Sequence, residues 1–86
     1  MTRRKVLITG AGSGLGRALA QRYANAGCAI ACVDIVLERA RETSAMLKGD
    51  GHLAIAMSVA SDEEFDALRD AVDAQFGPLD VLVNNA

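Results

Sequence analysis

The chain has 86 residues, of which 51% are hydrophobic and only 3% aromatic, and its formal net charge is −2. A chain of this length forms one small domain at most, and its core must be built from aliphatic side chains and alanines. The negative net charge excludes a broad basic surface for nucleic acid. The basic residues at positions 3–5 are therefore interpreted as a solvated start of the chain.

Membrane insertion, a disulfide and a metal centre are each disfavoured. The apolar run after the basic residues covers only positions 6–8, too short for a membrane span or a secretion signal, so we expect a cytoplasmic protein. Cys28 and Cys32 fall on one predicted strand, about 13 Å apart at about 3.3 Å per residue, and are expected to be buried thiols. The single histidine, His52, has no partner at ligand spacing and is expected at a strand edge.

The first predicted element is a strand over residues 5–9, which runs into a turn containing Gly10, Gly12, Gly14 and Gly16. A helix follows at once, so unpaired amide groups and the positive helix end meet at one point, which favours a phosphate. Gly10 is expected to turn the chain and Gly14 to let the backbone approach a pyrophosphate. Gly16 is expected to let the helix lie close on the sheet.

The helix after this turn is predicted over residues 15–26, with Gly27 as its C-cap. Its apolar spacing predicts a sheet-facing side made of Leu15, Ala18, Leu19 and Tyr23 or Ala26. The water-facing side is predicted to carry Arg17, Gln21, Arg22 and Asn25.

Strands and helices continue to alternate. A continuously apolar strand is predicted over residues 28–33, ending at Asp34, and a helix from 36 or 37 to 48 whose inner side carries Leu37, Ala40, Ser44 and Leu47. A third strand follows over residues 52–59. Ser61 and Glu64 then form a predicted capping box for a helix that buries Phe65, Leu68, Val72 and Phe76. A fourth strand is predicted over residues 79–84.

This alternation predicts an α/β fold with a doubly wound, Rossmann-type parallel sheet, of which the chain forms the amino-terminal half in the strand order 3-2-1-4. The ligand crevice of such a sheet lies at the carboxyl ends of strands 1 and 4, where the order reverses. Residues 9–15 and 84–86 should therefore face each other.

The glycine spacing narrows the class of nucleotide site. The common dinucleotide pattern would need glycine at Leu15, and a Walker loop would need Lys and Ser or Thr after the last glycine. Thr9 and the glycines at 10, 14 and 16 instead fit Thr-Gly-x-x-x-Gly-x-Gly, which resembles the cofactor loop of classical short-chain dehydrogenases/reductases. Segments 14–20, 27–29 and 79–86 resemble the same family.

The resemblance implies a nicotinamide-dependent oxidoreductase that transfers hydride to or from an alcohol or carbonyl substrate. It implies that Asn84 braces the central strand and that cofactor contacts come from Gly10, Gly12, Ser13, Gly14, Leu15, Gly16, Asp34, Ile35, Ser58, Val59, Asn85 and Ala86. The family's catalytic Ser and Tyr-x-x-x-Lys would lie beyond Ala86, and Tyr23 is no substitute because Gly27 stands four residues later. No catalytic residue is assigned, and residues 1–86 are expected to be one dinucleotide-binding domain, truncated after its fourth strand.

Asp34 predicts NAD in preference to NADP. It lies 24 positions after Gly10, where a carboxylate can accept the adenosine ribose hydroxyls and repel a 2′-phosphate. Ser13 and Ile35 also favour NAD, since neither has a basic side chain. The family usually has Asp-Val at the end of the third strand to hold adenine, but this chain has Ser58-Val59, which predicts weaker adenine binding.

Two alternatives stay open: a dinucleotide-binding module without catalysis, and an S-adenosylmethionine methyltransferase, since Gly10-x-Gly12-x-Gly14 also suits that fold. The methyltransferase is disfavoured by Ile8, which stands where an acid is common, and by Asn84-Asn85-Ala86. Because the fourth strand would be an exposed apolar edge, the isolated chain is expected to associate with itself and not to catalyse. The complete enzyme is expected to be a homo-oligomer.

Overall fold

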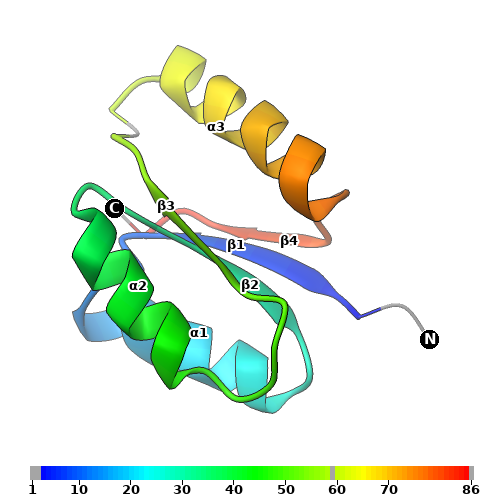
Figure 1. The fold of residues 1–86 in the computed structure, drawn as a ribbon. Coiled ribbons are helices and arrows are strands. Elements are labelled where there is room, and N and C mark those ends of the chain that lie inside the picture. The colour runs from blue at the N-terminus through cyan, green and yellow to red at the C-terminus, as the bar shows by residue number, and fades with distance from the viewer. Residues whose placement is uncertain (1–2, 59, 86) are drawn as a thin grey trace.

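The computed structural model describes residues 3–58 and 60–85. Within these residues, four strands alternate with three helices (Figure 1). In order, the elements are β1 (Lys5–Thr9), α1 (Gly14–Asn25), β2 (Ala29–Asp34), α2 (Leu37–Met46), β3 (Leu53–Ala56), α3 (Asp62–Phe76) and β4 (Val81–Val83). The predicted elements are all present, with β3 and β4 shorter than expected.

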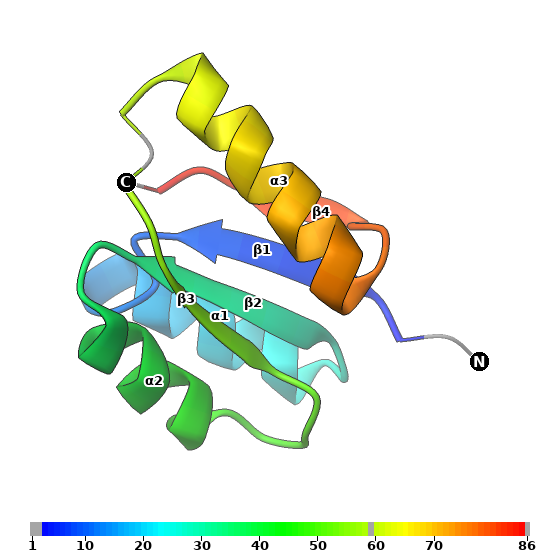
Figure 2. The ribbon, with the colours of Figure 1, turned by 45° about the horizontal axis from the view of Figure 1, so that its top comes forward.

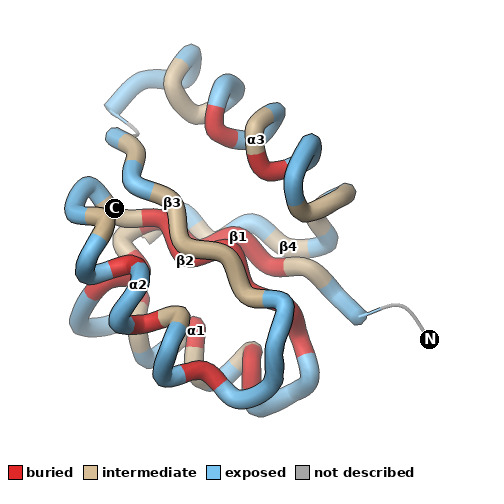
Figure 3. The backbone as a smooth tube through the Cα atoms, viewed as in Figure 1, coloured by how far each residue is buried: buried red, intermediate tan, exposed pale blue. Residues whose placement is uncertain are grey.

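The strands form one parallel sheet in the order β3-β2-β1-β4, which confirms the predicted topology. Helices α1 and α2 cover one face of the sheet and α3 covers the other (Figure 2). Side chains alternate along β1, so Val6 and Ile8 pack against α1 and α2, whereas Leu7 packs against α3. The two central strands are consequently buried on both faces (Figure 3).

Helix α1 packs through its smallest residues, which corrects the predicted inner face. Its buried residues are Gly16, Ala20 and Ala24, spaced by four, while Leu15 is 66% exposed. Ala18 and Ala26 are also exposed, and Leu19 and Tyr23 only flank the core. Small residues let the helix backbone come close to β1: a Cβ atom at Gly16 would collide with the Gly10 carbonyl. The C-cap is Ala26, one residue before the predicted Gly27.

Helices α2 and α3 follow their predictions with local differences. On α2 the buried residues are Ala40 and the unpredicted Thr43, and Leu47 is buried just past the helix end, whereas Leu37 and Ser44 are half-buried. On α3, Leu68 and Val72 are buried as expected, with Phe65 and Phe76 half-buried.

The capping box of α3 is one-sided. The Ser61 hydroxyl accepts a hydrogen bond from the Glu64 amide at 3.2 Å, as predicted. The Glu64 carboxylate accepts from that hydroxyl at 3.3 Å, rather than from the Ser61 amide.

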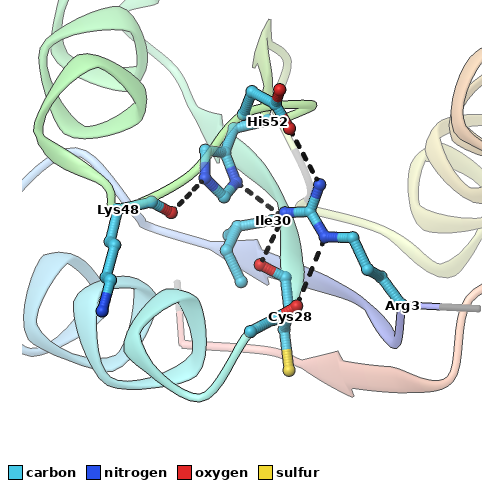
Figure 4. A network of polar contacts seen from close by, with 7 residues as sticks. Arg3, Cys28, Ile30, Lys48 and His52 are labelled. Carbon is cyan, nitrogen blue, oxygen red and sulfur yellow. Dashed lines mark hydrogen bonds and ion pairs between the residues drawn. The ribbon is translucent and has the colours of Figure 1, made fainter. Parts of the chain in front are cut away.

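A polar network ties the amino-terminal ends of β2 and β3 together (Figure 4). The Ile30 amide donates to Nδ1 of His52 at 3.1 Å, and the other ring nitrogen of His52 bonds the Lys48 carbonyl at 2.9 Å. Arg3 donates to the Gly27 and Cys28 carbonyls and to Asp50, so it is not a purely solvated residue as predicted. The His52 side chain thus links the start of β2 to the loop before β3.

Both cysteines are free and buried, as expected. Burial raises the pKa of the Cys32 thiol to about 12, so this thiol stays protonated at neutral pH.

The close approach of α1 to β1 predicts that Gly16→Ala destabilises the protein. The added methyl group would meet the Gly10 backbone, which cannot move without distorting the turn. We expect a loss of about 1–3 kcal/mol in the free energy of unfolding, measured by urea denaturation. Ala18→Leu, which adds more volume at an exposed position of the same helix, is the control and should change stability by less than about 0.5 kcal/mol. Equal stability of Gly16→Ala and wild type would contradict the packing described here.

Candidate functional site

A cleft of ≈ 470 Å³ lies at the carboxyl ends of the strands, where ligands bind in open α/β sheets. The ends of β1, β2 and β3 supply its walls, through Gly10, Val33, Asp34, Ile35, Met57, Ser58 and Ala60. Of the predicted contact residues, Gly10, Asp34, Ile35 and Ser58 therefore share one cavity. Val59 and Ala86, also predicted, lie outside the described residues.

The glycine loop between β1 and α1 has a backbone that requires glycine. Gly10 and Gly14 have φ angles of +64° and +57°, in the left-handed region that other residues rarely adopt. Gly12 is buried, and a Cβ atom there would lie 2.5 Å from Oδ2 of Asp34 and 2.6 Å from Cβ of Arg39. The loop is thus pressed against the end of β2.

The first turn of α1 is open to an anion. Ser13, Gly14 and Leu15 are exposed, and the turn contains no acidic side chain. Ser13 is the N-cap residue, yet within residues 3–58 and 60–85 its side chain makes no capping hydrogen bond. The first amide groups of a helix have no partner inside it, and the helix dipole adds positive charge at that end. Phosphate binding at this turn needs no further basic side chain.

Asp34 is held in place by backbone amides. Its Oδ2 accepts a hydrogen bond from the Gly12 amide at 3.0 Å, and its Oδ1 accepts from the Val36 amide at 3.0 Å. A carboxylate offers about four acceptor positions, so two remain after these bonds. The side chain is half-buried at the cleft wall, with its charge fixed in position.

The rest of the cleft wall is mostly apolar. Val33 is fully buried below it, Met57 is half-buried, and Ile35 is 75% exposed. Leu15, on the first turn of α1, is also exposed. Large exposed aliphatic side chains beside a cleft provide contact surface for a flat, partly apolar ligand.

The end of β4 closes against β1, as predicted. The Thr9 hydroxyl donates to Oδ1 of Asn84 at 3.0 Å and accepts from the Asn85 amide at 2.9 Å. These bonds join residues 75 and 76 positions apart and place Asn85 beside the start of α1, close to Gly16.

Two residues at the loop were not predicted as part of the site. Arg17, expected to face water, has a side chain only 27% exposed, and it donates to the Gly12 carbonyl at 2.6 Å and to the Thr43 hydroxyl at 2.9 Å. The Thr43 hydroxyl in turn donates to the Ala11 carbonyl at 2.8 Å. The only sequence signals were an arginine directly after the last glycine and a β-branched hydroxyl residue inside a helix.

Two further expectations concern a metal site and a membrane span. Within the part of the chain that the structure describes, no three His, Cys, Asp or Glu side chains are grouped so that they could hold a metal ion. No helix in residues 3–58 and 60–85 has the length and apolar character needed to cross a membrane.

Comparison with known proteins finds a dehydrogenase family model and dehydrogenases among the similar proteins. The family model described as short chain dehydrogenase matches residues 4–86. D-threitol dehydrogenase of Mycolicibacterium smegmatis is 46% identical over 82 residues, which cover 93% of this chain and 32% of that protein. Galactitol 2-dehydrogenase of Agrobacterium fabrum is 42% identical over 80 residues, covering 93% and 31%. The chain thus spans about one third of the length of these two relatives.

A solved structure with a bound nicotinamide cofactor has the same fold. The crystal structure of 3-ketoacyl-(acyl-carrier-protein) reductase from Brucella melitensis complexed with NADH superimposes with a TM-score of 0.81 at 35% identity, over 92% of this chain and 32% of that one. The same family is indicated by the sheet order, the position of the cleft, the glycine loop and the family model. The chain belongs to the short chain dehydrogenase family and forms the cofactor-binding Rossmann region of that fold.

Proposed function

We propose that the protein binds NAD in preference to NADP in the cleft at the carboxyl ends of the strands, as part of an oxidoreductase that acts on alcohol and carbonyl substrates. The observation that carries the preference is the Asp34 carboxylate, fixed by the Gly12 and Val36 amides with two acceptor positions left. The two adjacent hydroxyls of the adenosine ribose would fill those positions. A 2′-phosphate would bring negative charge against the same carboxylate.

The other proposed cofactor contacts are assigned from the residues in and around the cleft. The amides of Ser13, Gly14, Leu15 and Gly16, at the first turn of α1, would hold the pyrophosphate. Ile35 and Met57 would flank the adenine, with Ser58 at its edge. Asn85, and Ala86 by resemblance to the family, would lie along the nicotinamide ribose. When bound, the nicotinamide supplies or accepts the hydride, while these residues bind and orient the dinucleotide.

The substrate class is proposed from the relatives. Threitol, galactitol and sorbitol dehydrogenases are named for sugar alcohols, which supports a secondary alcohol and its ketone as the substrate pair. We assign no proton-transfer residue within this chain, and Tyr23, which lies on α1 and is partly buried against the core, stays outside the site. Family membership removes the methyltransferase alternative. A cytoplasmic location and homo-oligomeric assembly stay predictions.

The cofactor preference is tested by comparing NADH and NADPH binding to wild type and Asp34→Ala. We expect wild type to favour NADH, and the variant to lose up to two charge-assisted hydrogen bonds, each about 1.5–3 kcal/mol. The variant should also lose its discrimination between the two cofactors. Fluorescence titration of the reduced nicotinamide measures both affinities.

Because Asp34 also supports the glycine loop, Asp80→Ala is a matched control. Asp80 likewise accepts from a backbone amide, that of Lys5 at 2.8 Å, but at the opposite end of β1. This variant should keep the wild-type ratio of the two affinities. Equal or tighter binding of NADPH by wild type would refute the proposed preference.

Ser58 provides a second test at the adenine end of the cleft. A carboxylate accepts a stronger hydrogen bond than a hydroxyl from the adenine amino group, so Ser58→Asp should tighten the binding of AMP in calorimetry. Ser58→Ala, the control, should bind AMP no better than wild type. Unchanged affinity in Ser58→Asp would mean that side-chain contacts at this position do not limit adenine binding.

A further inference from the structure

The backbone N–H and C=O groups of Ala11 and Gly12 are held from both sides. On the sheet side, the Ala11 amide donates to the Val33 carbonyl at 3.0 Å and the Gly12 amide donates to Asp34 at 3.0 Å. On the helix side, Thr43 donates to the Ala11 carbonyl and Arg17 donates to the Gly12 carbonyl. All four polar backbone groups of this stretch therefore have partners.

The helix-side contacts form one connected unit, here named the Arg17–Thr43 clamp. Thr43 lies on α2 and is fully buried, and its hydroxyl accepts from Nε of Arg17 at 2.9 Å while donating to Ala11 at 2.8 Å. Arg17 lies on α1, and the nitrogen that bonds Gly12 also faces Glu42 at 3.4 Å. The clamp thus joins the loop, α1 and α2.

Packing alone does not explain this clamp. Placing a guanidinium and a hydroxyl between two helices costs desolvation, which their hydrogen bonds only offset. The loop itself gives the physical reason, because glycines at 10, 12 and 14 leave its peptide groups free to rotate. If the peptide group between Gly12 and Ser13 turned over, the Gly12 carbonyl would leave the clamp and bring a partial negative charge toward the phosphate site. Fixing the loop before binding reduces the entropy lost on binding.

We propose that Arg17 and Thr43 are positioning residues for the cofactor pyrophosphate: they hold the Ala11 and Gly12 carbonyls away from the first turn of α1, so that the amides that follow converge on the phosphates. Neither residue contacts the cofactor in this arrangement. The proposal rests on the proposed function only in requiring a bound dinucleotide. NAD and NADP share the pyrophosphate, so the choice between them does not affect it.

The test is a double-mutant cycle on the protein with Thr43→Val, Arg17→Met and the double variant. Dissociation constants are measured for NADH by fluorescence and for adenosine, which has no phosphate, by competition. Each single variant should weaken NADH binding about fivefold to tenfold, the value of one hydrogen bond, and change adenosine binding less than about twofold. The double variant should be no weaker than about the worse single variant, because both residues act through one network.

Three matched variants separate positioning from other effects. Thr43→Val leaves the Arg17 charge in place, so a loss of NADH affinity in this variant cannot come from a removed charge. Thr43→Ser keeps the hydroxyl and should bind NADH like wild type. If Thr43→Val fails to fold, Arg17→Met, which removes the bond to the Gly12 carbonyl, carries the test. Arg22→Met removes an exposed arginine from the same helix and should bind NADH like wild type.

Several outcomes would overturn the proposal. Wild-type NADH affinity in both single variants would show that the clamp does not position the loop. An equal loss of adenosine binding would show a general structural defect instead. Additive losses in the double variant would show that Arg17 and Thr43 act independently and not through one network. If wild type binds NADPH better than NADH, the proposed cofactor preference fails, and the same cycle run with NADPH still decides the role of the clamp.

Discussion

The hydrogen bond from the Gly12 amide to the Asp34 carboxylate is the interaction on which the candidate site depends. It joins the loop after β1 to the end of β2, and it requires glycine because a Cβ atom at position 12 would lie 2.5 Å from the accepting oxygen. The parallel register that pairs Thr9 with Val33 brings these two ends side by side. One contact therefore orients both the loop that would face phosphates and the carboxylate that would face a ribose.

Most of the fold could be predicted because its rules are local. Continuous apolar strands, intervening helices and the glycine-rich turn specify a parallel sheet, and the order β3-β2-β1-β4 follows from the way such sheets are wound. The inner face of α1 could not be predicted by the same rules. Periodicity gives weight to large apolar residues such as Leu15, whereas this helix is held close to β1 by Gly16, Ala20 and Ala24.

The candidate site also has a part that can be predicted from the sequence and a part that cannot. The glycine loop, Asp34 and Ser58 are recognisable from spacing and family resemblance, and the structure places them around one end of the sheet. Arg17 and Thr43 are not recognisable, because their hydrogen bond joins positions 26 apart and depends on how α1 and α2 pack. The contacts of Arg3 cannot be predicted for the same reason, since its carbonyl partners come from the turn before β2. Supporting residues of this kind emerge only from tertiary structure.

The most direct measurement is a titration of the isotopically labelled protein with NADH, followed through its backbone amide resonances. The largest shifts are expected at the loop and first turn of α1, residues 10–16, and at Asp34 to Val36, because these amides surround the phosphates and the ribose-binding carboxylate. The amides near Arg3, Lys48 and His52, at the opposite ends of the strands, should not move. Shifts concentrated at that opposite end, or none at residues 10–16, would contradict the site described here.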